Sequence, residues 1–312
     1  MPQIQFSKPP FETGKPCPCG STSNFEQCCL VGDQIMVKMP RLLPPGPATR
    51  FAHPKCFLNP TNDCSTDITG EHYFSKNMLK SMPGDIEYFG MPWTEPGKPV
   101  SMGINSAVSN ILCGRHNSSL HFLDDTAGRL FRFILETGPD LENETHTNCR
   151  SLLINGKALE LWCLKALYGA FHAKLASNNQ TPLLETHTLD VQPFIDALDG
   201  RPLQHPHGLY LLARQAQVIE TSSARISLVP TGPADGNVVQ GVRIGLWHFE
   251  FEVVLDAGAA DISHLRERAQ YRPMAMVFRN NVREHTVGLT WEASETSGAI
   301  VEFVTFPKGG TS

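Results

Sequence analysis

The 312-residue chain carries 26 Lys and Arg against 31 Asp and Glu, a formal net charge of −5, and 41% of its residues are hydrophobic. This composition is typical of a folded globular protein, long enough for two domains or for one domain with small appended modules. No apolar run reaches the ~18 residues that a membrane span needs, and the first residues lack the pattern of a secretory signal. We therefore expect a cytoplasmic protein without a membrane partner.

The charge is distributed unevenly along the chain. Residues 1–121 hold ten Lys and Arg against nine Asp and Glu, whereas the remainder holds 16 against 22. Any contact with nucleic acid is therefore expected on the N-terminal part, with modest help from bulk electrostatics. The acidic C-terminal part is better suited to a protein partner, a small ligand or another copy of itself.

Seven of the nine cysteines lie within the first 113 residues, and this clustering indicates metal sites. The cytosol keeps thiols reduced, so clustered cysteines there favour metal binding over disulfides. The first cluster consists of Cys17, Cys19, Cys28 and Cys29. Four thiolates in two close pairs can supply the tetrahedral ligand set of Zn²⁺, and metal binding would supply the folding free energy of so short a segment.

The first cluster also resembles a known motif. The run Lys15-Pro16-Cys17-Pro18-Cys19-Gly20-Ser21, followed by Cys28-Cys29, is similar to the SEC-C motif, a short zinc-binding element. The resemblance implies a role in protein contacts, so a protein partner is expected for residues 1–35. The lysines usual in that family are absent here, where Thr22, Ser23, Asn24, Glu26 and Gln27 stand instead.

Residues 36–54 are rich in proline and are predicted to be a linker, because proline at this density prevents regular helix or sheet. A second cluster of candidate ligands follows. Cys56 and Cys64 precede Cys113 and His116, which together form a plausible structural zinc set. Between the two halves lies Gly70-Glu71-His72, and Asn117 and His121 follow the second half four residues apart, on one face of an expected helix.

Residues 55–138 resemble the HNH, or ββα-metal, nuclease family in this order of motifs. The resemblance implies that His72 is the general base and that Asn110 orients it. It also implies that Glu71, Asn117 and His121 hold a catalytic Mg²⁺ or Mn²⁺ against the scissile phosphate. This sequence departs from the family in the seven residues that separate Cys56 from Cys64, where two are usual, and in the long stretch between His72 and Cys113.

The C-terminal part, residues 150–312, is predicted to be an α+β domain of unknown role. Apolar residues at three- and four-residue spacing predict a long helix over 152–176, and a short helix is expected over 191–198. From residue 208 the apolar period changes to two, which is typical of half-buried strands. The strands expected are 209–213, 225–229, 247–255, 274–278, 286–291 and 300–306, in a mostly antiparallel sheet. The fold class is therefore α+β with small zinc modules in front.

Two functions remain open from the sequence. The first is a metal-dependent HNH-like endonuclease that hydrolyses phosphodiester bonds in nucleic acid, with DNA favoured over RNA as the substrate and a role in host defence or a mobile element. The second is a zinc-binding adaptor with a degenerate HNH-like fold, which holds partners and cuts nothing. The acid–His pair Glu71-His72 favours the nuclease, since a structural zinc knuckle has no need of it. The scarcity of nearby cations (Lys76, Lys80 and Arg115) favours the adaptor.

Overall fold

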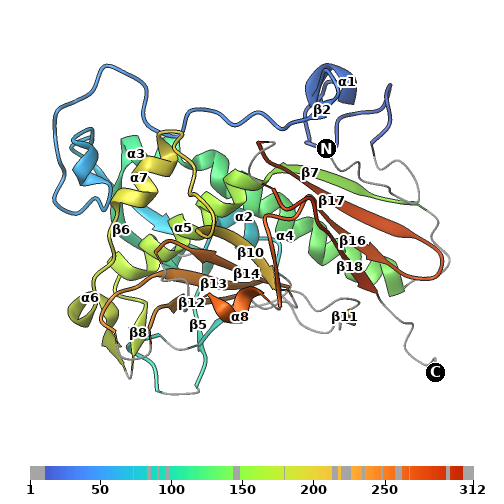
Figure 1. The fold of residues 1–312 in the computed structure, drawn as a ribbon. Helices are drawn as coiled ribbons and strands as arrows, with labels where there is room; N and C mark the ends of the chain where they lie inside the picture. The colour runs from blue at the N-terminus through green and yellow to red at the C-terminus, as the bar shows by residue number, and fades with distance from the viewer. Residues whose placement is uncertain are drawn as a thin grey trace.

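The computed structural model describes residues 11–304 except 73, 83–85, 90, 96–97, 143–147, 179, 213–216, 219–225, 234–235, 247–248, 257–261, 267 and 293–295. Within these residues the chain has the expected α+β class, with helices packed among antiparallel-rich sheets (Figure 1). No helix in this part of the chain is long and apolar enough to cross a membrane.

The N-terminal segment contains little regular structure. It has one short helix and one small hairpin, α1 (Phe25–Cys28), β1 (Leu30–Val31) and β2 (Gln34–Ile35). The proline-rich stretch that follows has no helix or strand, as predicted, until the single turn η1 (Asn59–Thr61) between Cys56 and Cys64.

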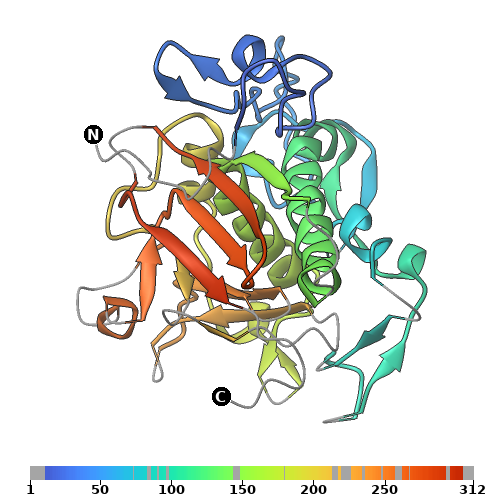
Figure 2. The same ribbon diagram turned by 90° about the vertical axis from the view of Figure 1, so that its right-hand side faces the viewer.

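A ββα unit occupies the region of the second cysteine cluster. Strand β3 (Ile68–His72) pairs antiparallel with β6 (Val108–Cys113), with an irregularity in register between Thr69 and Gly70. Helix α3 (Gly114–Ser119) follows β6 directly, and α4 (His121–Glu142) continues after Leu120. The connection from β3 to β6 includes α2 (Lys76–Leu79), which packs on α4. It also includes the hairpin β4 (Glu87–Tyr88) and β5 (Val100–Ser101) and the turn η2 (Ile104–Ser106); Figure 2 shows this hairpin projecting away from the sheets.

Two five-stranded sheets form the second half of the molecule, where the sequence suggested one. The first is antiparallel throughout, in the order β12 (Ile226–Thr231), β13 (Gly241–Leu246), β14 (Phe249–Val254), β10 (Gly208–Leu212) and β15 (Ala269–Tyr271). The second is mixed, in the order β11 (Gln217–Val218), β18 (Ile300–Val304), β16 (Ala275–Arg279), β17 (Glu284–Thr290) and β7 (Ser151–Asn155). In it only β16 and β17 pair antiparallel.

Helix α5 (Gly156–His172) lies at the centre of the fold and contacts α4 and strands of both sheets. Its residues 156–171 are all buried, including the charged Lys157, Glu160 and Lys165. The remaining short elements, α6 (Leu183–Thr186), α7 (Gln192–Leu198), α8 (Ser263–Arg266) and the hairpin β8 (Ser177–Asn178) with β9 (Thr181–Pro182), lie at the periphery. Because α5 is enclosed on all sides, any charge on it must be compensated by another buried group.

The expected helix over 152–176 is shorter than its apolar pattern suggested. Residues 151–155 form β7, paired parallel with β17, because the run Leu152-Leu153-Ile154 fits a strand buried on both faces as well as it fits a helix. Asn155 ends the strand and caps the helix, since its side-chain oxygen accepts a hydrogen bond from Ala158 N at 3.0 Å. The predicted strands are observed where the structure describes them; Ala213, Arg225, Trp247, His248 and residues 305–306 lie outside the described residues.

The hydrophobic core is shared by the ββα unit and the sheets. One cluster of buried side chains extends from Leu42 through Leu123 and Trp162 to Phe303. The regions expected as residues 55–138 and 150–312 therefore pack on each other through α4 and α5.

Candidate metal centres and the histidine beside them

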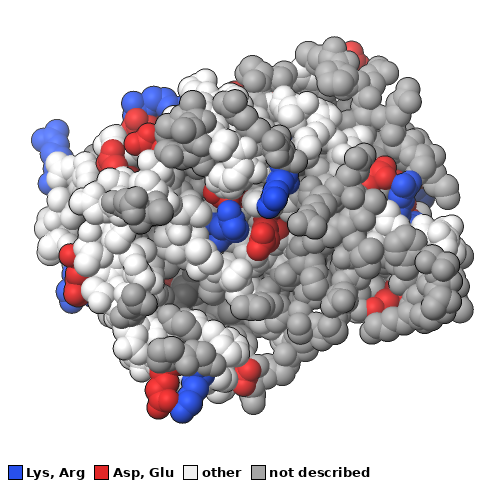
Figure 3. All heavy atoms as spheres, turned by 60° about the horizontal axis from the view of Figure 1, so that its bottom comes forward, with Lys and Arg blue, Asp and Glu red and all other residues white. Residues whose placement is uncertain are grey.

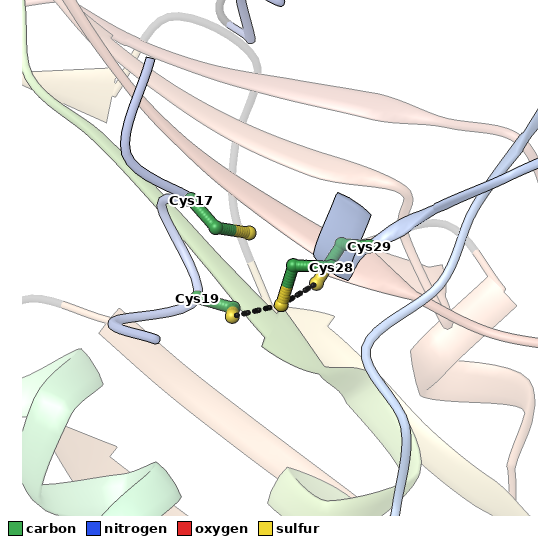
Figure 4. A group of neighbouring side chains, drawn as sticks. All are labelled: Cys17, Cys19, Cys28 and Cys29. Atoms are coloured by element: carbon green, nitrogen blue, oxygen red, sulfur yellow. Dashed lines mark hydrogen bonds between the residues drawn. The ribbon is translucent and has the colours of Figure 1, made fainter. Parts of the chain in front are cut away.

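The first cluster brings its four cysteines to one point. The sulfur atoms of Cys17, Cys19, Cys28 and Cys29 lie within 4.8 Å of one another, and none is in a disulfide (Figure 4). Cys28 Sγ lies 3.4 Å from Cys19 Sγ and 3.7 Å from Cys29 Sγ. Tetrahedral zinc with Zn–S bonds of ~2.3 Å requires sulfur separations of about 3.8 Å. The cluster therefore has the size and chemistry of a zinc site.

The hydroxyl and amide groups of Ser21 favour the thiolate form of Cys19, whereas burial raises the pKa of Cys17 and of Cys29. Ser21 Oγ donates to Cys28 Sγ at 3.0 Å. Burial opposes ionisation of Cys19, but hydrogen bonds from Ser21 and from neighbouring thiols lower the pKa of Cys19 to about 7. A thiolate is the form that binds a metal ion.

The first cluster is attached to the edge of the mixed sheet. Leu153 N of the edge strand β7 donates to Pro18 O at 3.2 Å, and Leu153 packs in one buried cluster with Cys17, Phe25, Cys29 and Val37. Arg129 of α4 donates to Pro18 O at 3.2 Å from its Nη2 atom. This face of the segment that carries the first cluster therefore contacts its own chain and covers an edge strand that would otherwise offer unpaired backbone groups.

The attachment gives a testable consequence. We expect Cys17→Ser to lose the first metal ion and keep the second, because the two clusters share no ligand. The amide of Leu153 should then lose its protection from hydrogen exchange, since its acceptor Pro18 lies between two ligands of the first cluster. Zinc content and hydrogen-exchange mass spectrometry of residues 151–155 measure both effects. Unchanged protection of β7 in a variant that has lost zinc would contradict the idea that the first cluster stabilises this strand.

The second cluster is fully buried. Nδ1 of His116 lies 3.2 Å from Cys113 Sγ, 3.6 Å from Cys56 Sγ and 3.7 Å from Cys64 Sγ. All four ligand atoms lie within 4.8 Å of one another. Burial lowers the pKa of His116 to about 4, so its ring is neutral and Nδ1 is free to bind a cation. This cluster too could hold a metal ion.

The surroundings of the second cluster orient its ligands. His116 Nε2 lies 3.0 Å from Thr61 Oγ1, in the short turn that fills the long gap between Cys56 and Cys64. Such an outer contact fixes the ring and its tautomer, as is usual for metal-binding histidines. Arg115 in α3 pairs with Asp63 beside Cys64, with Nε and Oδ1 3.0 Å apart. The seven-residue spacing is thus accommodated by one turn of 3-10 helix.

The candidate base, His72, is at the end of β3. Its side chain is half-buried, and its Nε2 atom is buried without a hydrogen-bond partner in the described part of the chain. Burial and the nearby charge of Lys76 lower the pKa of His72, with Asp124 opposing them, so the ring is neutral at neutral pH. A neutral imidazole nitrogen with no partner can accept a proton.

Asn110, the candidate orienting residue, lies on the neighbouring strand. It is exposed and directly opposite Gly70, while His72 is opposite Val108. Cross-strand partners share a face of the sheet, and so do residues two apart on one strand. Asn110 and His72 are therefore diagonal neighbours on one face of the antiparallel pair β3–β6.

The three candidate ligands for a catalytic cation each have a different partner. Glu71 is buried, and its Oε1 atom lies 2.5 Å from Lys165 Nζ. Asn117 Nδ2 donates to Thr69 Oγ1 at 3.0 Å. His121 Nε2, at the exposed start of α4, lies 3.2 Å from Asp125 Oδ2. Alternation along β3 also directs Glu71 away from the face that carries His72.

Two residues that the sequence analysis did not single out complete the surroundings of Glu71. Lys165 Nζ lies 2.6 Å from Asp124 Oδ2, so one ammonium group bridges two carboxylates. Burial lowers the pKa of Lys165, but the two carboxylates outweigh it and raise the pKa above its ordinary value. Asp124 and Asp125 follow His121 at helical spacing, which is the only signal for Asp124 in the sequence; nothing local marks Lys165, which lies in an apolar helix.

The set expected to hold a catalytic Mg²⁺ or Mn²⁺ stays a prediction, and in this structure Glu71, Asn117 and His121 each have a different partner. Among the described residues, the only groups of three or more His, Cys, Asp or Glu side chains close enough to share a metal are the two cysteine clusters. Glu71, the one carboxylate of the expected set, is already compensated by a buried cation.

No family model, no curated protein and no solved structure matches this chain.

Proposed function

We propose that this protein hydrolyses phosphodiester bonds in nucleic acid, with DNA favoured over RNA as the substrate, and that the ββα unit is its active module. In support, the Cys56/Cys64/Cys113/His116 cluster closes a β3–β6–α3 unit that presents His72 at the end of its first strand. The observation that carries the proposal is the buried Nε2 atom of His72, which has no hydrogen-bond partner among the residues that the structure describes. A buried polar atom without a partner is costly, and such atoms occur where a ligand or a reaction needs them.

In the proposed reaction His72 is the general base. Its neutral Nε2 accepts a proton from a water molecule as the water oxygen bonds to phosphorus, a step that requires the groups covering this buried atom to move aside. The bond from phosphorus to the leaving ester oxygen breaks, that oxygen takes up a proton from solvent, and protonated His72 returns its proton to solvent. Asn110, on the same face of the antiparallel pair, orients the ring or the phosphate. No step is assigned to a divalent ion, because each of the residues expected to hold one has another partner.

The zinc sites have a structural role in this proposal. Both sets consist of soft ligands with no open position contributed by a carboxylate or a water-exposed side chain, which is typical of structural rather than catalytic zinc. On the face shown in Figure 3, the described positive and negative side chains are interspersed, so this face would offer a nucleic acid little general attraction. Contacts with the phosphate backbone are therefore expected to be few and weakly dependent on salt.

A plasmid assay tests the proposal. His72→Ala should reduce nicking of supercoiled DNA by about 10²–10⁴-fold, the usual contribution of a general base. Zinc content should stay at the wild-type value, since His72 belongs to neither cluster. His205→Ala, at an exposed histidine of the C-terminal part, is the matched control and should leave nicking unchanged.

A second candidate function is a non-catalytic zinc adaptor. The bridging of Glu71 by Lys165 favours it, because that carboxylate has no free role. The adaptor would use the uncovered side of the SEC-C-like segment or the acidic C-terminal part to hold a protein. Zinc-loaded, folded protein that cuts neither DNA nor RNA, with or without added Mg²⁺ or Mn²⁺, would overturn the nuclease proposal in favour of this one.

A further inference from the structure

Lys165 joins three elements that are distant in the sequence. It extends from the central helix α5 to Glu71 on β3 and to Asp124 on α4, with Nζ–O distances of 2.5 and 2.6 Å. Its side chain is only 3% exposed, and the carboxylates are 11% and 19% exposed. An isolated pair of carboxylates in such a place would carry a large desolvation cost, which the ammonium group offsets.

Further hydrogen bonds hold this arrangement in place. Ser75 Oγ donates to Asp124 Oδ1 at 2.6 Å, and Trp162 Nε1 donates to Ser75 Oγ at 2.8 Å. Trp162 is buried on the same helix as Lys165. One oxygen of Asp124 is thus fixed by a hydroxyl group and the other by the ammonium group, which lies between Asp124 Oδ2 and Glu71 Oε1.

We infer that the Lys165 ammonium group is the permanent cation of this site and takes the place of the divalent ion that a resemblance to HNH nucleases implies at Glu71. The Nζ–O distances of 2.5 and 2.6 Å are longer than the ~2.0–2.1 Å bonds of Mg²⁺ to oxygen, so an ion in place of the ammonium group would draw the two carboxylates closer together. A lysine and a divalent ion cannot occupy this position together, because both need the same two oxygens.

Lys165 is therefore a positioning residue. It holds the Glu71 carboxylate against α4 and α5. It thereby fixes the end of β3, where His72 directly follows Glu71. This consequence rests on the proposed function: cleavage that depends on His72 should need no added Mg²⁺ or Mn²⁺. The replacement of an ion by the ammonium group does not rest on it and can be tested on binding alone.

The experiment measures Mn²⁺ binding to the full-length, zinc-loaded chain by electron paramagnetic resonance. Wild-type protein should bind no Mn²⁺ at this site. Lys165→Ala removes the ammonium group and leaves both carboxylates, so it should gain one Mn²⁺ per chain, at least about tenfold tighter than any wild-type binding. Mn²⁺ should also raise the melting temperature of Lys165→Ala alone. The matched control Lys174→Ala removes an exposed lysine that pairs with Glu185, and it should behave as wild type.

A second substitution identifies the site. Adding Asp124→Asn to Lys165→Ala should abolish the gained Mn²⁺ binding, because one of the two anionic ligands is lost. If Lys165→Ala folds without gaining Mn²⁺, or fails to fold even when refolded with Mn²⁺, the ammonium group does not stand in for an ion. Wild-type protein that binds one Mn²⁺ and loses it in Glu71→Gln would overturn the inference as well. These outcomes are measured by metal binding and not by cleavage. Failure of the nuclease proposal can therefore be distinguished from failure of this inference.

Discussion

Cys113→Ser is expected to remove the second zinc ion and to abolish cooperative folding of the chain. Cys113 Sγ is the ligand nearest to His116 Nδ1, and Cys113 is completely buried at the end of β6. Structural zinc contributes an apparent ~10–16 kcal/mol in small zinc-binding peptides, whereas a whole domain is stable by only ~5–15 kcal/mol. Cys56, Cys64 and Cys113 also belong to the main hydrophobic core. Loss of this ion should therefore destabilise both sheets as well as the ββα unit.

Metal analysis and thermal unfolding monitored by circular dichroism measure this effect. The matched control is Cys149→Ser, which removes an exposed free thiol outside both clusters and should keep the zinc content and melting temperature of the wild type. A Cys113→Ser protein that unfolds cooperatively near the wild-type temperature would show that the second cluster is dispensable for the fold.

Arg272→Met is expected to destabilise the protein by about 3–5 kcal/mol, the usual cost of removing one partner of a buried ion pair. Arg272 and Glu160 are paired twice, with Nε–Oε2 and Nη2–Oε1 distances of 2.9 and 2.8 Å, and both side chains are almost fully buried. Arg272 Nη2 also donates to Leu203 O at 3.0 Å, and Leu209 N donates to Glu160 Oε2 at 2.8 Å. The pair therefore joins α5 to the antiparallel sheet.

The destabilisation should depend on pH. Burial raises the pKa of Glu160, and Arg272 opposes that rise. Without Arg272 the folded-state pKa of Glu160 should rise further above its unfolded value. A group with a raised folded-state pKa favours the folded state at low pH and loses that contribution as the pH rises through the folded-state pKa. The difference in unfolding free energy between Arg272→Met and wild type should therefore shrink as the pH falls from 7 toward 4.

Urea unfolding at several pH values tests this, with two comparison variants. Arg279→Met breaks an exposed pair with Glu302 and should cost no more than ~1 kcal/mol. The double variant Arg272→Met/Glu160→Met removes both charges and should be more stable than Arg272→Met alone. If Arg272→Met lowers the free energy of unfolding only slightly, or by the same amount across this pH range, then other groups compensate the charge of Glu160.

The metal clusters could be predicted from the sequence because their ligands are marked by residue type and spacing. Cys17 and Cys19, and likewise Cys28 and Cys29, are close pairs separated by one short turn, so local geometry nearly determines their meeting. The second set was predicted from the order of its motifs along the chain. The pairing of β3 with β6 places Cys113 beside the segment that contains Cys64, and the two side chains meet in one cluster. Alternating apolar residues likewise predicted most strands of the two sheets.

The surroundings of Glu71 could not be predicted in the same way. Lys165 meets Glu71 only because α5 packs against the ββα unit, and no local pattern encodes that contact. The apolar spacing of α5 indicated a helix with one buried stripe, but the helix is enclosed on all sides, and so its lysine and glutamate are buried with partners from other elements. Strand β7 could not be predicted for a related reason. A short apolar run fits a buried strand and a helix equally well, so its residues were assigned to the long helix.

Zinc X-ray absorption on the purified full-length chain, combined with its metal content, tests the two-centre arrangement most directly. We predict two zinc ions per chain and an average first shell of sulfur at ~2.3 Å with a small nitrogen contribution, since the two sets contain seven cysteines and one histidine. A protein that purifies folded with no zinc, or whose zinc is bound mainly by oxygen and nitrogen, would contradict this account of the fold and of the module built on it.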